Sequence, residues 1–154
     1  MAVRDGATVI ALVRRAQTGR ATELGAHHAL ASDQPNLSSA IRAIAPDGVN
    51  RIAEVDFADH VDLDAEIVAI GGVISSYYSS ADRPTIPYWK LGFADTTLRL
   101  LGSDDFAPAV KAHAAQELRL RCSTGACGHG SRNAFRSTTS RGPTSWSSRA
   151  STDE

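Results

Sequence analysis

Five short apolar segments alternate with segments of helical spacing along most of this 154-residue chain. Their apolar and β-branched residues make each of the five a strand candidate. These candidates are Ala7–Val13, His27–Ala31, Val49–Val55, Val73–Tyr78 and Thr96–Leu101. The helices expected between and after them have apolar residues at about every third or fourth position, and they are Pro35–Ala45, Asp62–Ile70 and Asp104–Leu118. Strands that alternate with helices of about ten residues are typical of an α/β fold with a parallel sheet covered on both faces.

The first predicted strand ends on two cations, Arg14 and Arg15, and a short polar helix is expected to follow. A strand, a helix and a second strand form half of a nucleotide-binding α/β unit, in which the end of the first of these strands meets the adenosine ribose. An acid there accepts a hydrogen bond from the 2′-hydroxyl, whereas the planar guanidinium of an arginine suits a 2′-phosphate. The sequence therefore predicts that Arg14 and Arg15, with the hydroxyl of Thr18, bind the 2′-phosphate of NADPH. Two solvated surface cations are the alternative interpretation.

Composition and charge exclude several classes of protein. A formal net charge of -1 gives no reason to expect a nucleic-acid partner, and no apolar run reaches the ~20 residues that a membrane span needs. The N-terminus has no continuous apolar core typical of a signal peptide, and the two cysteines do not indicate an oxidising compartment. We therefore expect a cytoplasmic protein that binds neither nucleic acid nor membrane.

The segment after about Leu120 departs from the pattern of the rest of the chain. It is rich in Ser, Thr, Arg and Gly and almost lacks aliphatic residues, so we expect residues 120–154 to be disordered. Cys122, Cys127 and His129 have the spacing C-x4-C-x-H without a second pair, which is a weak signal for zinc. We assign no metal ligand to the chain.

Residues 83–95 carry two prolines and the pair Tyr88-Trp89, and they are expected to form a loop between the fourth and fifth strands. One interpretation is a flap over a cofactor. The other, which we favour, is a connection whose aromatic side chains pack on the sheet, because large aromatics are more often packing residues.

Five segments of residues 6–118 together carry a resemblance to a known family. They are GATVIALVRR, ATELGAHHALA, AIRAIAPDGVNRIAEVDF, LDAEIVAIGGVISSYYSS and PYWKLGFADTTLRLL. In order and spacing they resemble the zinc-type alcohol dehydrogenase-like cofactor domain of the medium-chain dehydrogenase/reductase superfamily, in its NADPH:quinone oxidoreductase branch. The resemblance covers about three quarters of the chain and well under half of a complete family member. It implies that the chain is truncated.

The resemblance implies an incomplete doubly wound, Rossmann-like parallel sheet that lacks its first strand. Residues 1–119 would be a partial NADP-binding domain, and residues 120–154 the disordered tail. The implied function is that of a fragment of an NADPH-dependent oxidoreductase that passes hydride to a quinone or an activated alkene. Because the glycine-rich phosphate turn has no counterpart here, we expect the chain alone to be inactive and to bind NADP(H) weakly. The alternative is a non-catalytic gene fragment, or a small interaction module that forms a homodimer through its fifth strand.

The resemblance also places candidate cofactor contacts at two strand ends. Val55 and Phe57, after the third strand, would contact a ribose through backbone and apolar surface, and Ser75, Ser76 and Tyr77, at the end of the fourth, would face the nicotinamide. Ordinary strand ends are the alternative in both cases. No residue is assigned a catalytic role.

Two further observations concern titratable residues near the third strand. Glu54 and Asp56 flank Val55 and would share one face of an extended strand, but this spacing alone is weak evidence for a catalytic carboxylate pair. His60 is interpreted as a structural or surface residue.

Overall fold

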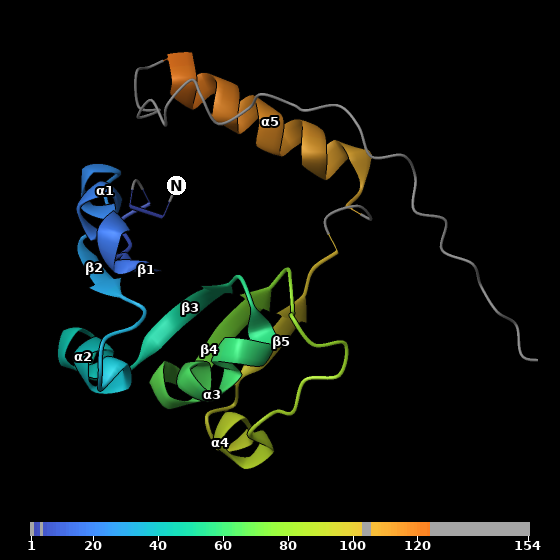
Figure 1. The fold of residues 1–154 in the computed structure, drawn as a ribbon. Coiled ribbons are helices and arrows are strands. Elements are labelled where there is room, and N and C mark those ends of the chain that lie inside the picture. Colours follow the sequence, from blue (N-terminus) through green and yellow to red (C-terminus); the bar gives the residue numbers. More distant parts are fainter. Residues whose placement is uncertain (1, 4, 103–105, 124–154) are drawn as a thin grey trace, which may run out of the picture. The chain divides into compact units, whose positions relative to one another are not determined.

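The computed structural model describes residues 2–3, 5–102 and 106–123 (Figure 1). The chain divides into two compact units, Met1–Glu117 and Leu118–Glu154, and every strand among the described residues belongs to the first. Among the described residues, no helix is long and apolar enough to span a membrane. The strands are β1 (Ile10–Val13), β2 (His28–Ala31), β3 (Val49–Glu54), β4 (Val68–Ser76) and β5 (Thr97–Leu100). The helices are the short 3-10 helix η1 (Arg15–Gln17), α1 (Thr18–Glu23), α2 (Leu37–Ile44), α3 (Phe57–Ile67), α4 (Tyr88–Phe93) and α5 (Pro108–Ser123).

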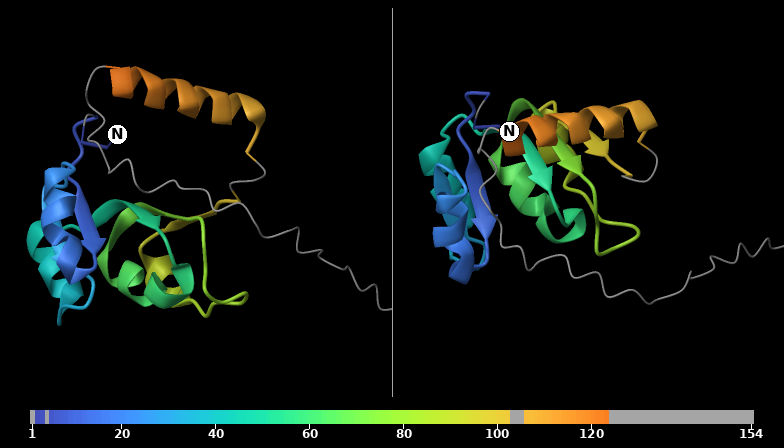
Figure 2. Two further views of the ribbon diagram at one scale, coloured as in Figure 1. Left: turned by 45° about the horizontal axis from the view of Figure 1, so that its top comes forward. Right: turned by 90° about the horizontal axis from the view of Figure 1, so that it is seen from above.

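All strand pairs in the described residues are parallel, and they form two sheets. β1 pairs with β2 from Ile10↔His28 to Val13↔Ala31. β4 lies between β3 and β5, with Ile74 opposite Ile52 on one side and Leu98 on the other. Figure 2 shows β3, β4 and β5 side by side as arrows that point the same way. The predicted α/β class with parallel pairing is confirmed.

The order of the strands matches a doubly wound sheet from which one strand is absent. In the order 3-2-1-4-5-6 of such sheets, β2 and β1 occupy the places of strands three and two, and β3, β4 and β5 those of strands four to six. No described strand stands in the place of strand one, so β1 and β3 each have one edge without a strand partner in this part of the chain. The predicted incomplete, Rossmann-like sheet is confirmed. Such unpaired edges invite association with other strands.

Helix α3 and strand β4 differ from the sequence prediction. The helix was expected at Asp62–Ile70, but it spans Phe57–Ile67, and β4 takes over at Val68 instead of Val73. The apolar run at this junction is compatible with helix or strand in isolation. β4 is central in its sheet, and burial of Val68, Ala69 and Ile74 favours the strand. Phe57 and Val61 start the helix early because both bury against the sheet.

Two other elements also depart from expectation. Part of the predicted loop 83–95 is the helix α4, whose Leu91 is buried while Trp89 and Phe93 are 71% and 81% exposed. The aromatic side chains therefore do not pack on the sheet as favoured from the sequence. α5 extends to Ser123, so residues 120–123 of the expected disordered tail are helical. Residues 124–154 lie outside the described part of the chain.

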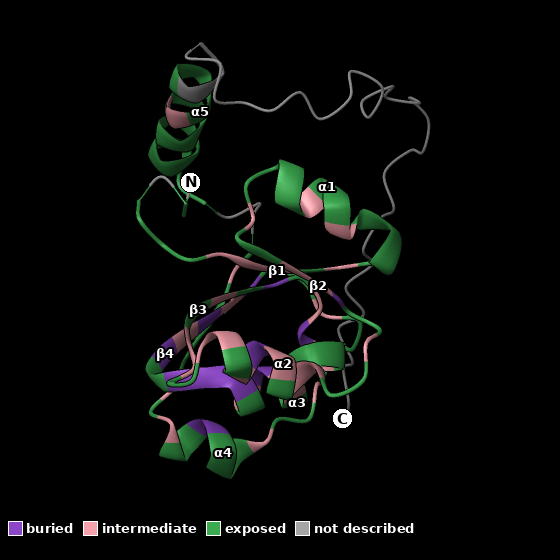
Figure 3. Cartoon of the chain, turned by 90° about the vertical axis from the view of Figure 1, so that its left-hand side faces the viewer, coloured by how far each residue is buried: buried purple, intermediate pink, exposed green. Residues whose placement is uncertain are grey.

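The apolar core lies between the β3–β4–β5 sheet and the helices α3 and α4. Its buried members are Phe57, Val61, Val68, Ile74 and Leu91, and Ile52, Ala65 and Ala94 pack against them. Figure 3 shows this concentration of buried residues along β4 and α3, in contrast to α1, which has none. The core thereby fixes the carboxyl end of the larger sheet, where β3 leads into α3.

Gly48 makes the close approach of two chain segments possible at the start of β3. Its φ is +95°, a conformation that other residues rarely adopt. A Cβ atom there would lie 2.7 Å from the backbone N and Cα of Ala69 and 2.9 Å from the carbonyl oxygen of Ile67. The turn before β3 therefore needs glycine on both conformational and steric grounds.

We predict that Gly48→Ala lowers the free energy of unfolding by roughly 2–4 kcal/mol, since it adds left-handed backbone strain to a backbone clash. Gly19→Ala is the matched control, because Gly19 lies in α1 and nothing would meet its Cβ within 4 Å. That control should leave stability unchanged or raise it by up to about 1 kcal/mol. Urea unfolding followed by circular dichroism measures both, and equal midpoints for the two variants would contradict the prediction.

Candidate functional site

The carboxyl ends of β3, β4 and β5 meet at one edge of the sheet, where an open pocket of about 370 Å³ lies. Open α/β sheets bind ligands outside the carboxyl ends of their strands. The pocket is lined by residues at or after these three ends: Phe57, Ser76, Tyr77, Tyr78, Ser79, Ala81, Asp82, Pro84, Leu100, Leu101 and Gly102. Three of them, Phe57, Ser76 and Tyr77, are sequence-predicted site residues.

Backbone hydrogen bonds hold the pocket walls together. The N–H of Phe57 donates to the carbonyl of Tyr78 at 3.0 Å, and the N–H of Leu101 donates to that of Ser76 at 2.8 Å. The Ser76 hydroxyl also donates to the Tyr78 carbonyl at 3.0 Å, so it is already engaged. The walls that remain accessible are mainly aromatic and aliphatic, with Tyr77 56% and Leu100 76% exposed. Such a surface suits a flat ring better than a charged group.

Asp56 anchors the loop that borders the pocket. Its Oδ1 accepts the backbone N–H of Ser80 at 2.8 Å, and this hydrogen bond lowers the pKa of the Asp56 carboxyl below its usual value. The hydroxyl of Ser80 also donates to Asp59 at 3.3 Å. Because its pKa is lowered on folding, the ionised Asp56 contributes to stability at pH values above the ordinary pKa of aspartate. This contribution is lost as the pH falls through the folded-state pKa.

A second group of predicted residues lies at the carboxyl end of β1. Arg15 pairs with Asp33, with Nη2 3.0 Å from Oδ1 and Nε 3.4 Å from Oδ2. Thr18 donates its hydroxyl to the carbonyl of Arg15 at 3.0 Å. Arg14 is exposed and, within the described chain, its guanidinium forms no ion pair or side-chain hydrogen bond. Of the two arginines, Arg14 is therefore the one whose charge is available to an anion.

The remaining predicted residues join neither group directly. Val55 is 56% exposed but does not line the pocket, and Ser75 lies within β4 opposite Ala53 and Arg99. Glu54 and Asp56 do not act as a pair, because Glu54 is buried and bonded to His60 while Asp56 bonds to Ser80. The structure thus gathers the other six candidate residues, Arg14, Arg15, Thr18, Phe57, Ser76 and Tyr77, at two carboxyl edges, one in each sheet.

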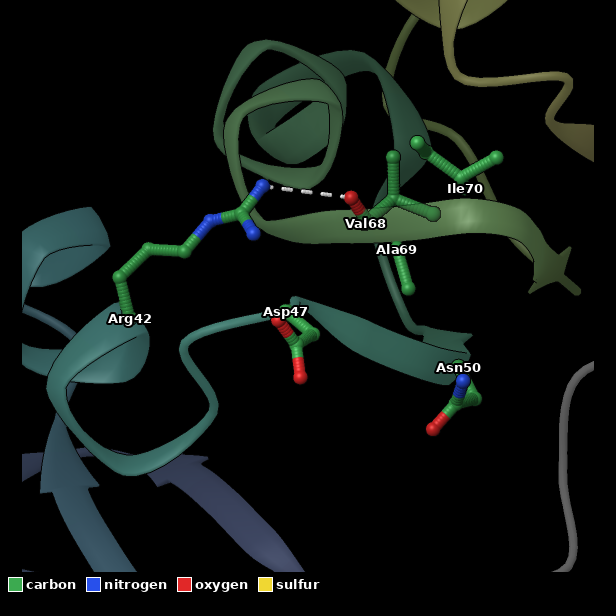
Figure 4. A pocket seen from close by; sticks show the side chains of 6 residues that line it. All are labelled: Arg42, Asp47, Asn50, Val68, Ala69 and Ile70. Atoms are coloured by element: carbon green, nitrogen blue, oxygen red, sulfur yellow. Dashed lines mark hydrogen bonds between the residues drawn. The ribbon is translucent and has the colours of Figure 1, made fainter.

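A larger pocket of about 530 Å³ lies at the opposite, amino end of β3 and β4, and it is lined by Arg42, Asp47, Asn50, Val68, Ala69 and Ile70 (Figure 4). The Arg42 guanidinium donates to the carbonyls of Glu66 at 2.9 and 3.0 Å, Pro46 at 3.2 Å and Val68 at 3.3 Å. It thereby satisfies carbonyls at the end of α3, which have no partner within the helix. No sequence motif marks Arg42 as functional, and its place in the last turn of α2 is the available signal. We interpret this pocket as structural.

Among the described residues, no group of three or more His, Cys, Asp or Glu side chains could hold a metal ion. Cys127 and His129, weighed above as zinc ligands, lie outside the described residues.

Comparison with known proteins supports the fold. No family model and no curated protein matches the chain. Benzyl alcohol dehydrogenase from Acinetobacter calcoaceticus is 20% identical with a TM-score of 0.67, over 78% of this chain and 34% of that one. An NAD-dependent alcohol dehydrogenase is 21% identical with a TM-score of 0.68, over 81% and 36%. The CurK enoyl reductase is 14% identical with a TM-score of 0.64, over 80% and 38%.

This chain therefore spans between 34% and 38% of the length of these solved structures. The predicted resemblance to the zinc-type alcohol dehydrogenase-like proteins is confirmed at the level of the fold. At these identities the likeness establishes the fold alone, so the roles of the candidate residues stay predictions.

We predict that Arg42→Ala lowers the free energy of unfolding by about 1–3 kcal/mol, because it leaves the carbonyls of Glu66 and Val68 without their donor. Arg51→Ala is the matched control, since Arg51 is exposed and bonds only to the carbonyl of the preceding Asn50 in the described chain. It should change stability by less than about 0.5 kcal/mol. Urea midpoints measured side by side test this, and an equal loss in both variants would refute the structural role of Arg42.

Proposed function

We propose that this chain is part of an NADPH-dependent oxidoreductase that transfers hydride to a quinone or an activated alkene. The observation that carries the proposal is the available guanidinium of Arg14 at the carboxyl end of β1, which pairs in parallel with β2. In doubly wound folds, that strand end meets the adenosine ribose, and an arginine there accommodates a 2′-phosphate.

Arg14 and Arg15 have different roles in this proposal. Arg14 supplies the charge that binds the 2′-phosphate, since a guanidinium forms short, charge-assisted hydrogen bonds to phosphate oxygens. Arg15 is held by Asp33, whose carboxylate offsets its charge and would repel a phosphate placed against it. Thr18 steadies the turn through its bond to the Arg15 carbonyl. NADPH is therefore favoured over NADH by one arginine and not by the pair.

The pocket after β4 and β5 fits the other end of such a cofactor. Its exposed Tyr77 and Leu100 offer the apolar surface against which a nicotinamide ring packs. When bound, a nicotinamide supplies the hydride, and the protein supplies orientation and exclusion of water. The likeness to an NAD-dependent alcohol dehydrogenase and an enoyl reductase supports nicotinamide chemistry of this class. The quinone or enone substrate follows from the sequence resemblance.

The described residues fit only part of the cofactor. A pyrophosphate is held in such folds by a glycine-rich turn at a helix N-terminus after the first strand, and the described chain has no strand in that place. We therefore expect this chain to bind NADPH weakly and to be inactive by itself.

A second candidate function is a non-catalytic module that forms a homodimer through β5. All four residues of β5 are exposed, and within the described chain the strand pairs only with β4. Nearby in the chain, α4 exposes Trp89 stacked on Phe93 with ring centroids 5.7 Å apart. A free strand edge and an exposed apolar surface are each typical of an association site.

We predict that NADPH shifts amide resonances around Arg14 at lower concentration than NADH does, because only NADPH carries the 2′-phosphate. Arg14→Ala should weaken NADPH binding roughly tenfold and leave NADH binding unchanged, as expected for the loss of a charge-assisted pair worth about 1.4 kcal/mol. Nuclear magnetic resonance titration of the full chain detects binding in the millimolar range. Arg20→Ala is the control, because Arg20 pairs with Glu23 on α1.

Equal affinity for the two nucleotides in the unaltered chain would contradict the NADPH assignment. Failure of both nucleotides to shift any resonance, together with a dimer in sedimentation, would favour the second candidate.

A further inference from the structure

Glu54, His60 and Asp64 form a cluster of titratable side chains between the end of β3 and helix α3. Glu54 is 6% exposed and Asp64 is 2% exposed. Nδ1 of His60 lies 2.8 Å from Oε1 of Glu54, and the His60 ring is partly open to solvent. The same Glu54 oxygen accepts the backbone N–H of Asp56 at 2.5 Å. The candidate site described above uses none of these three side chains.

Asp64 is the unusual member of the cluster. Its Oδ2 atom is buried and has no hydrogen-bond partner in the described part of the chain. A buried carboxylate without a partner is costly, whereas its protonated form is neutral. His60 and Asp64 are four residues apart on α3, so they share one face of the helix. Asp64 therefore lies on the face that carries the Glu54–His60 pair.

No other cation near α3 compensates Asp64 in the described structure. On α2, the guanidinium of Arg42 is engaged by backbone carbonyls of Glu66 and Val68. On α4, Lys90 lies 3.5 Å from the carboxylate of Glu66. Asp56, in the turn before α3, adds a negative charge. β3 carries Arg51, whose exposed guanidinium donates to the carbonyl of Asn50, and β4 contributes the neutral Ser76 at this edge. Only a protonated His60 can offset the two buried carboxylates.

We propose that Glu54, His60 and Asp64 form a pH-sensitive latch for α3. The latch is closed when Asp64 carries a proton and His60 is a cation paired with Glu54. It loosens when both protons are lost, because two buried carboxylates then lie together without a compensating charge. The first residue of the helix, Phe57, lines the pocket and bonds to Tyr78, so loosening reaches the pocket wall.

The protonation equilibria support the same direction. Burial and, to a smaller extent, the charge of Glu54 raise the pKa of Asp64 to about 7, although His60 opposes the rise. The hydrogen bond to Glu54 raises the pKa of His60 above its usual value. Both groups bind protons more tightly in the folded chain than in the unfolded one. Their contribution to stability is therefore full at low pH and is lost as the pH rises through the folded-state pKa values, near neutrality for Asp64.

The test is the melting temperature of the full chain between about pH 5 and pH 8.5 for the unaltered protein, Asp64→Asn and Asp62→Asn. Asp62 is exposed on the same helix and serves as the matched control. We expect the melting temperature of the unaltered protein and of Asp62→Asn to fall across this range. Asp64→Asn should show a flatter profile and melt above the unaltered protein at the high-pH end. Profiles of the same shape for all three proteins would overturn the proposal.

A second measurement does not depend on the variants. The carboxyl carbon resonance of Asp64 in the unaltered chain should titrate with a midpoint near pH 7, and a midpoint near the ordinary value of about 3.9 would overturn the latch.

Discussion

The parallel pairing of β4 with both β3 and β5 is the interaction on which the larger part of this structure depends. It brings three carboxyl ends to one edge, where the chain turns into α3 and into the segments that line the pocket. Backbone bonds from Phe57 to Tyr78 and from Leu101 to Ser76 continue the strand pairing beyond the strands themselves. The core beneath, centred on Ile74, keeps β4 in the middle of its sheet.

The same logic applies on a smaller scale to β1 and β2. Their parallel register brings the two strand ends together, so that Arg15 after β1 pairs with Asp33 after β2. Because the strands of each sheet run in the same direction, their carboxyl ends meet at one edge, and both of these edges carry candidate binding residues. Their chemistry differs, since one edge carries an available cation and the other an apolar pocket, and the proposal assigns these to the two ends of a dinucleotide.

Local patterns in the sequence were sufficient for the strands, the parallel class and the arginines at the end of β1, because β-branched runs and helical spacing are encoded over a few residues. Local patterns did not predict the boundary between α3 and β4, because the apolar residues near Val68 are compatible with a helix or a strand. Burial in the sheet decides between the two. The exposed helix α4 was missed for a related reason. Large aromatic residues in such a segment predict packing on the sheet, but Tyr88, Trp89 and Phe93 are exposed and Leu91 is the buried residue of the helix.

The candidate site was predictable only in part, because its roles depend on contacts that the local sequence does not encode. Arg15 is paired and Arg14 is available because of the position of Asp33, which the local sequence does not give. Phe57 lines the pocket and Val55 does not because of the direction in which α3 begins. Glu54 and Asp56 looked like a pair along the chain, but the fold gives them His60 and Ser80 as separate partners. Contacts between residues distant in the sequence decide each of these roles.

Amide hydrogen exchange along the strands tests the central claim most directly, namely that β1–β2 and β3–β4–β5 are parallel sheets in which β1 and β3 each keep one edge without a strand partner among the described residues. The account predicts slow exchange along β4, which has a strand on both sides, and an alternating pattern in β1 and β3, where successive amides face a partner strand and an open edge in turn. Uniform protection along β1 and β3, or exchange of β4 as fast as that of an edge strand, would contradict it.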